Sequence, residues 1–247
     1  MDLNIKQDRL WEIDFLRGIA IILMIFFHII FDLNFYSITN FNISSGILFF
    51  IARLSATMFI TIAGISLSIS YSRVKNKLNK KDILKKFLKR GLKILLLGIF
   101  ISFVTWFYIP EAFIIFGVLH FIGLSIILSQ LFIRFRYLNI LFGLFFIIIG
   151  FFLRFFTFDF YFLLPLGFVP NNFWTVDYFP LFPWFGVILM GIFIGNFIYP
   201  DSKRNYNIVN LSKNEFILSI CFLGRNSLFI YFLHQPIIII FILIFLS

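Results

Sequence analysis

The sequence predicts an all-α protein, a polytopic bundle of about seven transmembrane helices, and two features of the chain lead to that prediction. Hydrophobic residues make up 61% of the chain and charged residues 13%, about half the charged share of a soluble domain. Apolar runs long enough to cross a bilayer as a helix recur along the whole chain. The period-two alternation typical of membrane β-barrels is not found. We therefore expect a single integral-membrane domain over residues 1–247.

The first three predicted spans are separated by connections of very different charge. The span 16–35 begins within the charged opening "EIDFLRG", and the span 46–71 follows a connection without any Lys or Arg. The span 91–108 begins at the end of the most basic part of the chain, residues 72–93, which contain ten Lys and Arg side chains. Acidic residues flank Lys6 and Arg9, and no small-residue cleavage site follows the first apolar run. We therefore expect that run to remain as a span rather than to be removed as a signal.

The other four predicted spans continue the same alternation. They cover residues 112–131, 137–156, 180–199 and 225–246. Arg134 and Arg136 precede the fifth span, whereas the connection 157–179 before the sixth contains no Lys or Arg. Three basic residues lie in the segment 203–213 before the last span. The stretch 214–223 is predicted either to lie at the membrane surface or to extend the last span.

The positions of the basic residues predict the orientation of the chain. Lys and Arg gather in every second connection, so the positive-inside rule places the N-terminus in the cytoplasm and the C-terminus outside. The cell membrane is the expected location. This distribution accounts for much of the net charge of +10, so a nucleic-acid partner is not expected. The single cysteine, Cys221, excludes an internal disulfide and does not suggest a thiolate metal site, and no metal is predicted.

The three histidines of the chain are each predicted to lie near the middle of the membrane on a different helix. At 1.5 Å per residue, His28 lies roughly 16 Å from the cytoplasmic end of its span, and His120 and His234 lie roughly 13 Å from the starts of theirs. Ionisable groups at such a depth are costly and usually mark substrate paths or reactive sites. Three groups at one depth favour convergence on one cavity. The alternative is that each makes one ordinary hydrogen bond between helices.

His28 and Asp32 are four residues apart and therefore share one helix face. A buried neutral imidazole can take a proton from a substrate. Asp32 either orients this ring and stabilises its protonated form, or is an ordinary carboxylate near the outer surface. Arg53 also falls in the outer half of the membrane. Pro236, two residues after His234, is expected to bend the last span and to open space beside that histidine.

Charges near the two membrane surfaces are candidates for substrate binding. Asp14 and Arg17, three residues apart, can pair on one helix face. The basic segment 72–93 either attracts anionic lipids or holds the phosphates of a nucleotide-bearing cofactor. On the opposite side, "VDYFPLFPWFG" places Asp177 and Trp184 beside the start of the sixth span, where a Trp is also common for interfacial reasons.

Five segments of the chain resemble a known family. They are "RLWEIDFLRGIAIILMIFFHIIFDL", "LSATMFITIAGISLSIS", "FGVLHFIGLS", "DYFPLFPWFGVILMGIFIG" and "GRNSLFIYFLHQPI". In this order they resemble the bacterial and archaeal relatives of heparan-alpha-glucosaminide N-acetyltransferase over nearly the whole chain. The first and last segments are also similar to the wider group of membrane acyltransferases that decorate surface glycans.

The resemblance implies that an acyl group passes from cytosolic acyl-CoA to an acceptor on the far side of the membrane. It also implies a CoA-binding region open to the cytoplasm and an acceptor that enters from outside. His28 falls at the family's first-span polar position, and Arg17 falls in its "LRG". The animal enzyme is thought to use a luminal histidine after the first span, but residues 33–45 contain no histidine, so that role does not transfer. With fewer spans and no extra N-terminal domains expected, a heparan-like acceptor does not transfer either.

These inferences combine into one hypothesis, an acyl-CoA-dependent N- or O-acetyltransferase. His28 removes the acceptor proton or briefly carries the acyl group, and Asp32 orients it. His120 or His234 polarises the thioester carbonyl or protonates the leaving thiolate. The predicted residues for acetyl-CoA or another acyl-CoA are Asp14, Arg17, Lys89, Arg90 and Arg225, and those for the acceptor are Arg53, Asp177 and Trp184.

Several alternatives stay open at this stage. The acceptor is an extracytoplasmic glycan, an amino sugar or a lipid, and membrane lipids are the other expected partners. The histidine that acts as the base and the oligomeric state, with a homodimer among the alternatives, are not determined by the sequence. The competing hypothesis is a proton-coupled transporter in which the same histidines relay protons. A transporter should show two broken helices or paired half-symmetry, and we find neither in the sequence.

Overall fold

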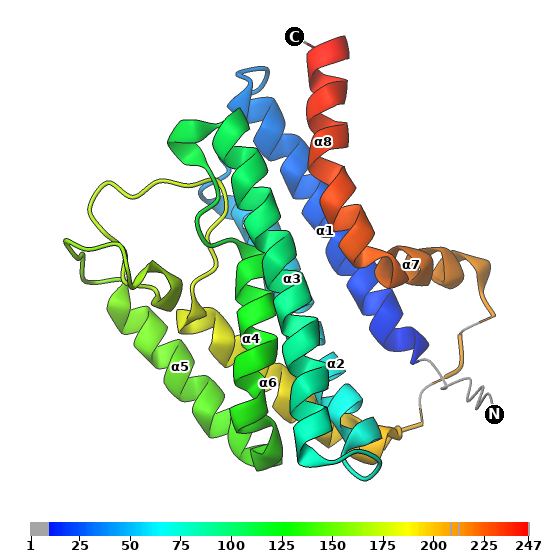
Figure 1. Cartoon of the computed structure of the whole chain (residues 1–247). Helices are drawn as coiled ribbons and strands as arrows, with labels where there is room; N and C mark the ends of the chain where they lie inside the picture. The colour runs from blue at the N-terminus through cyan, green and yellow to red at the C-terminus, as the bar shows by residue number, and fades with distance from the viewer. Residues whose placement is uncertain (1–9, 208, 212, 247) are drawn as a thin grey trace. The chain divides into compact units, whose positions relative to one another are not determined.

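The computed structural model of the chain describes residues 10–207, 209–211 and 213–246. Lys6 and Arg9, which support the prediction for the N-terminus, lie outside the described residues. Within the described part the chain is helical, with two isolated β-bridges and no strand, which confirms the all-α prediction (Figure 1). The helices are α1 (Trp11–Phe35), α2 (Gly46–Val74), α3 (Lys80–Tyr108), α4 (Val118–Phe132), α5 (Asn139–Leu153), α6 (Leu181–Ile198), α7 (Glu215–Arg225) and α8 (Ser227–Phe245). Short 3-10 helices lie at Pro110–Ala112, Ile133–Leu138, Leu164–Leu166 and Pro200–Ser202.

Six stretches of the described chain are long and apolar enough to cross a membrane. Five of them are single helices, and the sixth, Val118–Leu153, contains both α4 and α5. The chain reverses between these two helices at Arg136, which has a positive φ of 43°. Phe132 of α4 then packs against Phe142 and Phe146 of α5, with ring centroids 5.3 and 5.8 Å apart. The fourth and fifth predicted spans therefore correspond to α4 and α5, which share one apolar stretch. The fold class of a polytopic helical bundle is confirmed.

Two predicted boundaries are wrong. The third helix begins at Lys80 and not near residue 91, because the lysine-rich segment is itself helical and buries Ile83 and Phe87 at a four-residue spacing. The lysines mark where the apolar stretch begins, not where the helix begins. The fourth helix begins at Val118 and not at residue 112, because Pro110 starts a short 3-10 turn and the residues after it are extended.

The chain divides into two compact units, and the boundary between them falls within α2. Unit 1 contains the described residues up to Ile62 and those after residue 208, and unit 2 contains Ala63–Asn207. The prediction of a single domain over residues 1–247 is not tested by this division and stays a prediction.

In unit 1, α1 packs along α7 and contacts α8. Gly18 and Gly224 make the close approach of α1 and α7, because a Cβ on Gly18 would meet Ile220 and one on Gly224 would meet the backbone of Asp14. The hydroxyl of Ser55 on α2 donates a hydrogen bond of 2.9 Å to the carbonyl of Ala20 on α1. Small residues of this kind let helix backbones approach closely where lipid offers no hydrophobic driving force.

In unit 2, α3 packs on α4 and α5 packs on α6. Glycines again lie at the crossings, since Gly91 of α3 meets Gly123 of α4 and Gly143 of α5 meets Gly186 of α6. Large apolar side chains, among them Phe185, fill the space between these helices.

Connections that the charge pattern places on one side of the membrane meet in unit 2. Asp201, after α6, lies 2.5 Å from Lys75 at the end of α2 and 3.8 Å from Arg136 between α4 and α5. On the opposite side, the backbone N–H of Val176 donates to the carbonyl of Ala112. These contacts agree with the predicted alternation of connections. The side that faces the cytoplasm stays a prediction.

Candidate active site

The imidazole rings of His28 on α1 and His234 on α8 stack on each other in unit 1. Their centroids are 4.9 Å apart and their planes are inclined by 29°. His234 is buried, with 6% of its surface exposed, and His28 is half-buried. Two of the three predicted histidines are thus brought into contact by the first and the last helix.

The hydrogen bond of His234 fixes its tautomer. Nδ1 lies 2.6 Å from the carbonyl oxygen of Tyr231, one turn earlier in α8. A carbonyl only accepts, so Nδ1 carries the hydrogen and Nε2 keeps a lone pair. This Nε2 is buried and has no partner among the described residues. The geometry leaves His234 with one basic nitrogen that can receive a proton.

Two more polar side chains follow the histidines along their helices. Asp32 lies one turn after His28 on α1, and Gln235 is the residue after His234 on α8. The amide Nε2 of Gln235 donates to Oδ1 of Asp32 at 3.5 Å, which is a long hydrogen bond. Asp32 is 4% exposed. Gln235 was missed by the sequence analysis, although an amide inside the apolar run "FLHQPII" was a signal that could have found it.

We call His28, Asp32, His234 and Gln235 the polar cluster. Each contributes one buried atom without a protein partner in the described chain, and these atoms are Nδ1 of His28, Oδ2 of Asp32, Nε2 of His234 and Oε1 of Gln235. Buried polar atoms are normally hydrogen-bonded, and each unpaired one costs about 1–3 kcal/mol. Four such atoms on two facing helices make this the strongest candidate for a reaction site in the described part of the chain.

His120 lies in unit 2 and has a different environment. Its Nε2 is 3.3 Å from the hydroxyl of Ser102 on α3. That hydroxyl donates its hydrogen to the carbonyl of Ile114, so Nε2 of His120 must be the donor to the serine oxygen. A Cβ on Gly98 would lie 2.9 Å from the backbone nitrogen of His120. His120 is thus packed tightly against α3.

The predicted depth of His120 assumes a helix that begins at residue 112, but α4 begins only at Val118. Instead, residues 109–117 return along α3 in a largely extended form, and the N–H of Ile114 donates to Thr105. His120 nevertheless lies level with Gly98, ten residues before the end of α3, or roughly 15 Å by helical rise. Extended backbone at such a depth is tolerated where protein surrounds it.

Asp177 caps the first turn of α4. Its Oδ2 accepts a 3.0 Å hydrogen bond from the N–H of Val118. Burial raises the pKa of Asp177 to about 6, and the hydrogen bond from Val118 opposes this rise. Trp184 is buried in α6 against Phe179, with ring centroids 4.9 Å apart. Two of the three predicted acceptor residues are therefore packed within unit 2, and their role stays a prediction.

Three of the five residues predicted to bind the donor lie together at one end of unit 1. Asp14 accepts from Nε of Arg225 at 3.1 Å and lies 3.5 Å from Arg17. Lys89 and Arg90 are exposed on α3 and belong to unit 2. The predicted pairing of Asp14 with Arg17 is confirmed, and its extension to Arg225 on α7 was not foreseen.

Arg53, on the unit 1 part of α2, lies over the ring of Phe49 with its guanidinium carbon 5.1 Å from the centroid. It is exposed on the surface of its helix. Its predicted contact with an acceptor is not tested by this arrangement.

The family model for the catalytic region of heparan-alpha-glucosaminide N-acetyltransferase matches residues 9–236. The chain belongs to this family. The resemblance seen in the sequence motifs is thereby confirmed, and so is the assignment to multi-pass membrane acetyltransferases. No curated protein and no solved structure gives a significant match to the chain. The matched region of this family member includes the whole polar cluster.

Proposed function

We propose that the protein transfers an acetyl or longer acyl group from cytosolic acyl-CoA to an extracytoplasmic acceptor, and that the polar cluster is the reaction site. The acceptor is an amino sugar, a glycan or a lipid that offers a hydroxyl or an amine. The observation that carries the proposal is the stacked pair of His28 and His234, in a polar cluster with four buried polar atoms that have no partner among the described residues.

In the proposed reaction, a histidine of the cluster takes the proton of the acceptor as its oxygen or nitrogen attacks the thioester carbonyl carbon. The C–S bond breaks, and the same proton passes to the departing thiolate, so that the products are the acylated acceptor and free CoA. The sequence favours His28 as the base, and the bond from His234 to Tyr231 favours His234. Asp32 stabilises the imidazolium that forms.

The proposed donor site uses the two arginines that meet at Asp14. Guanidinium groups from α1 and α7 already converge on one anion, which shows that their arrangement accepts a negatively charged oxygen. A phosphate of acyl-CoA fits such a pair because guanidinium groups form bidentate bonds with phosphate. Lys89 and Arg90 remain further candidates, and anionic lipid headgroups are the competing ligands for these basic side chains.

The proposal is tested with purified protein in lipid nanodiscs and acetyl-CoA labelled in the acetyl group. Transfer of label to an added acceptor, or CoA release that depends on the acceptor, is expected for the native chain. His28→Ala and His234→Ala should each lower turnover by at least about 10²-fold. Ser219→Ala, which changes an exposed hydroxyl on α7, is the control.

Two results would contradict the proposal. If both histidine variants turn over acetyl-CoA like the native chain, the polar cluster is not the reaction site. If liposomes containing the protein pass protons or small molecules without any CoA, and no acyl transfer is found, the proton-coupled transporter is the better explanation of the histidine pair.

A further inference from the structure

Helix α7 is separated from α8 by a break in the helical backbone. Asn226 has φ −99° and ψ 16°, and its N–H bonds back to the carbonyls of Phe222 and Leu223. The chain changes direction here, and Figure 1 shows α7 running across the direction of α1 and α8. The prediction that residues 214–223 extend the last span is therefore wrong, and the alternative of a surface helix is left.

One face of α7 is fixed to α1. Ile217, Ile220, Cys221 and Gly224 are at least partly buried at the spacing of a single helix face. The thiol of Cys221 donates to the carbonyl of Trp11, and Ile220 fills the space above Gly18. These contacts involve only the face of α7 that lies against α1, so the other side chains of α7 are not needed to hold it there.

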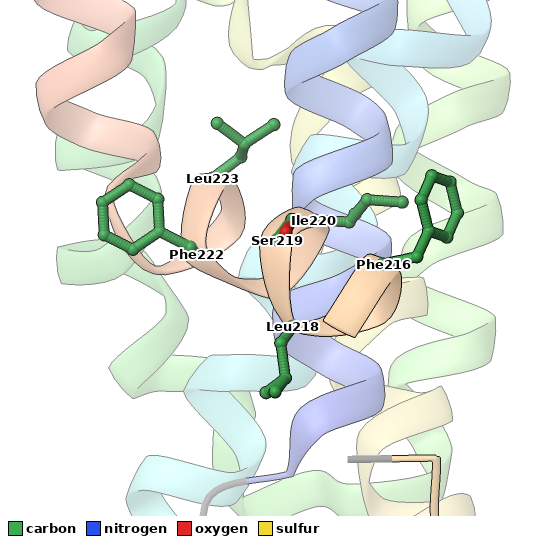
Figure 2. Close-up of a pocket in the computed structure, with 6 residues that line it drawn as sticks. All are labelled: Phe216, Leu218, Ser219, Ile220, Phe222 and Leu223. Atoms are coloured by element: carbon green, nitrogen blue, oxygen red, sulfur yellow. The ribbon is translucent and has the colours of Figure 1, made fainter. Parts of the chain in front are cut away.

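Apart from Glu215, Ser219 and Arg225, the remaining surface of α7 is apolar and largely exposed. Phe216 is 72% exposed and Phe222 is 63% exposed. Six side chains of α7 line an open hollow of about 500 Å³ (Figure 2). Ser219 supplies the one side-chain polar atom of this lining, and its hydroxyl already donates to the carbonyl of Glu215. The hollow has no spare side-chain donor, so it suits an apolar occupant.

The neighbouring surface indicates which apolar occupant this is. Helix α8 is apolar enough to span a membrane and exposes Phe229, Leu233 and Ile237, so its outer surface faces lipid chains. The apolar surface of α7 continues from this one across the single residue Asn226. An exposed cation, Lys213, lies just before α7, where a phospholipid phosphate would meet it.

We infer that α7 lies in the plane of the membrane and that acyl chains of the adjoining phospholipid leaflet cover Phe216, Phe222 and the hollow that they help to line. A helix of this kind is held roughly 5–10 Å deep, at the boundary between headgroups and acyl chains. The inference goes beyond the proposed function, since α7 would bind lipid in this way whatever reaction the polar cluster carries out.

Spin labels test this inference in nanodiscs that contain one copy of the protein. Phe216→Cys and Phe222→Cys are labelled in a Cys221→Ser background, since a serine hydroxyl can donate to the same Trp11 carbonyl. Both labels should collide with oxygen more than with a water-soluble nickel reagent, at an immersion depth of roughly 5–10 Å. Asn214→Cys, at the exposed residue just before α7, should show the opposite preference.

Two outcomes overturn the inference. Labels at 216 and 222 that meet the nickel reagent as freely as the label at 214 place α7 in water. Labels shielded from both reagents show that another part of the protein covers this face. If labelling disturbs the fold, Phe222→Trp replaces it, with quenching by bromine-labelled phospholipids as the measurement and Leu211→Trp as the control.

Discussion

The rings of His28 and His234 stack at a centroid distance of 4.9 Å, although they come from the first and the last helix of the chain. Two imidazolium ions at this distance would repel each other strongly away from water. The pair therefore carries at most one positive charge at a time. This property suits a step in which one proton is taken up and then returned.

The tautomer of His234 leads to a prediction that separates structure from chemistry. The amide nitrogen of His234→Asn can replace Nδ1 and donate to Tyr231, but the variant has no basic nitrogen. We expect its apparent Tm to stay within about 2 °C of the native value, while turnover falls at least about 10²-fold. His234→Leu should show both a lower apparent Tm and a lower turnover, because leucine neither donates to Tyr231 nor accepts a proton. Equal loss of Tm in the two variants would show that the bond to Tyr231 contributes little.

We expect the Asp32 carboxylate to decrease the stability of the folded protein while it supports acyl transfer. It is buried, and within the described residues of unit 1 no cation pairs with it. Asp32→Asn removes the cost of a buried unpaired charge, so we expect the apparent Tm to rise by about 2–4 °C while acyl transfer is lost. A lower Tm would mean that the carboxylate makes a stabilising contact that the amide cannot make. The measurement is thermal unfolding of the two proteins in the same nanodiscs.

Arg225 is expected to act on donor binding alone. Arg225→Gln removes one charge-assisted partner of a phosphate, which corresponds to about a tenfold increase in KM for acyl-CoA, with kcat nearly unchanged. Arg154→Gln, an arginine that lies over Phe151 in unit 2, is the matched control. An unchanged KM in Arg225→Gln would assign Arg225 to lipid or to structure, and would leave the histidine chemistry unaffected.

The raised pKa of Asp177 leads us to predict that the stability of the folded protein depends on pH. Its pKa of about 6 in the folded chain exceeds the ordinary value of 3.8, so the folded state binds this proton more tightly than the unfolded state does. The free energy of unfolding should therefore decrease as the pH rises from about 4 to about 6. In Asp177→Asn this decrease should disappear, because the amide oxygen can still cap Val118 without a charge.

The measurement for Asp177 is apparent Tm between pH 4 and pH 8 for the native chain and the variant. Asp159→Asn changes an exposed carboxyl of the same connection and should leave the pH profile unchanged. If Asp177→Asn keeps the native pH profile, another group is responsible.

The sequence predicted the helical bundle well because apolar runs of this length have few other stable forms. It placed the start of the third helix too late, because the lysine-rich segment after Lys80 is helical although it is charged. It placed the start of the fourth helix too early, because the chain after Pro110 is not α-helical until Val118. Counting residues along single helices placed His28 and His234 well enough to suggest that they meet. It could not find Gln235 or Arg225 as partners of Asp32 and Asp14, because both pairings join opposite ends of the chain.

Unit 1 is assembled from the two ends of the chain, and this sets the order in which it can be completed during synthesis. Asp32 and Gln235 are separated by 203 residues. At roughly 5–20 residues per second, α1 is in place for tens of seconds before α8 emerges. During that interval, the newly inserted α1 carries His28 and Asp32 without the helix that buries them. A ribosome that stops before α8 is complete leaves a chain in which these groups lack their partners on α8.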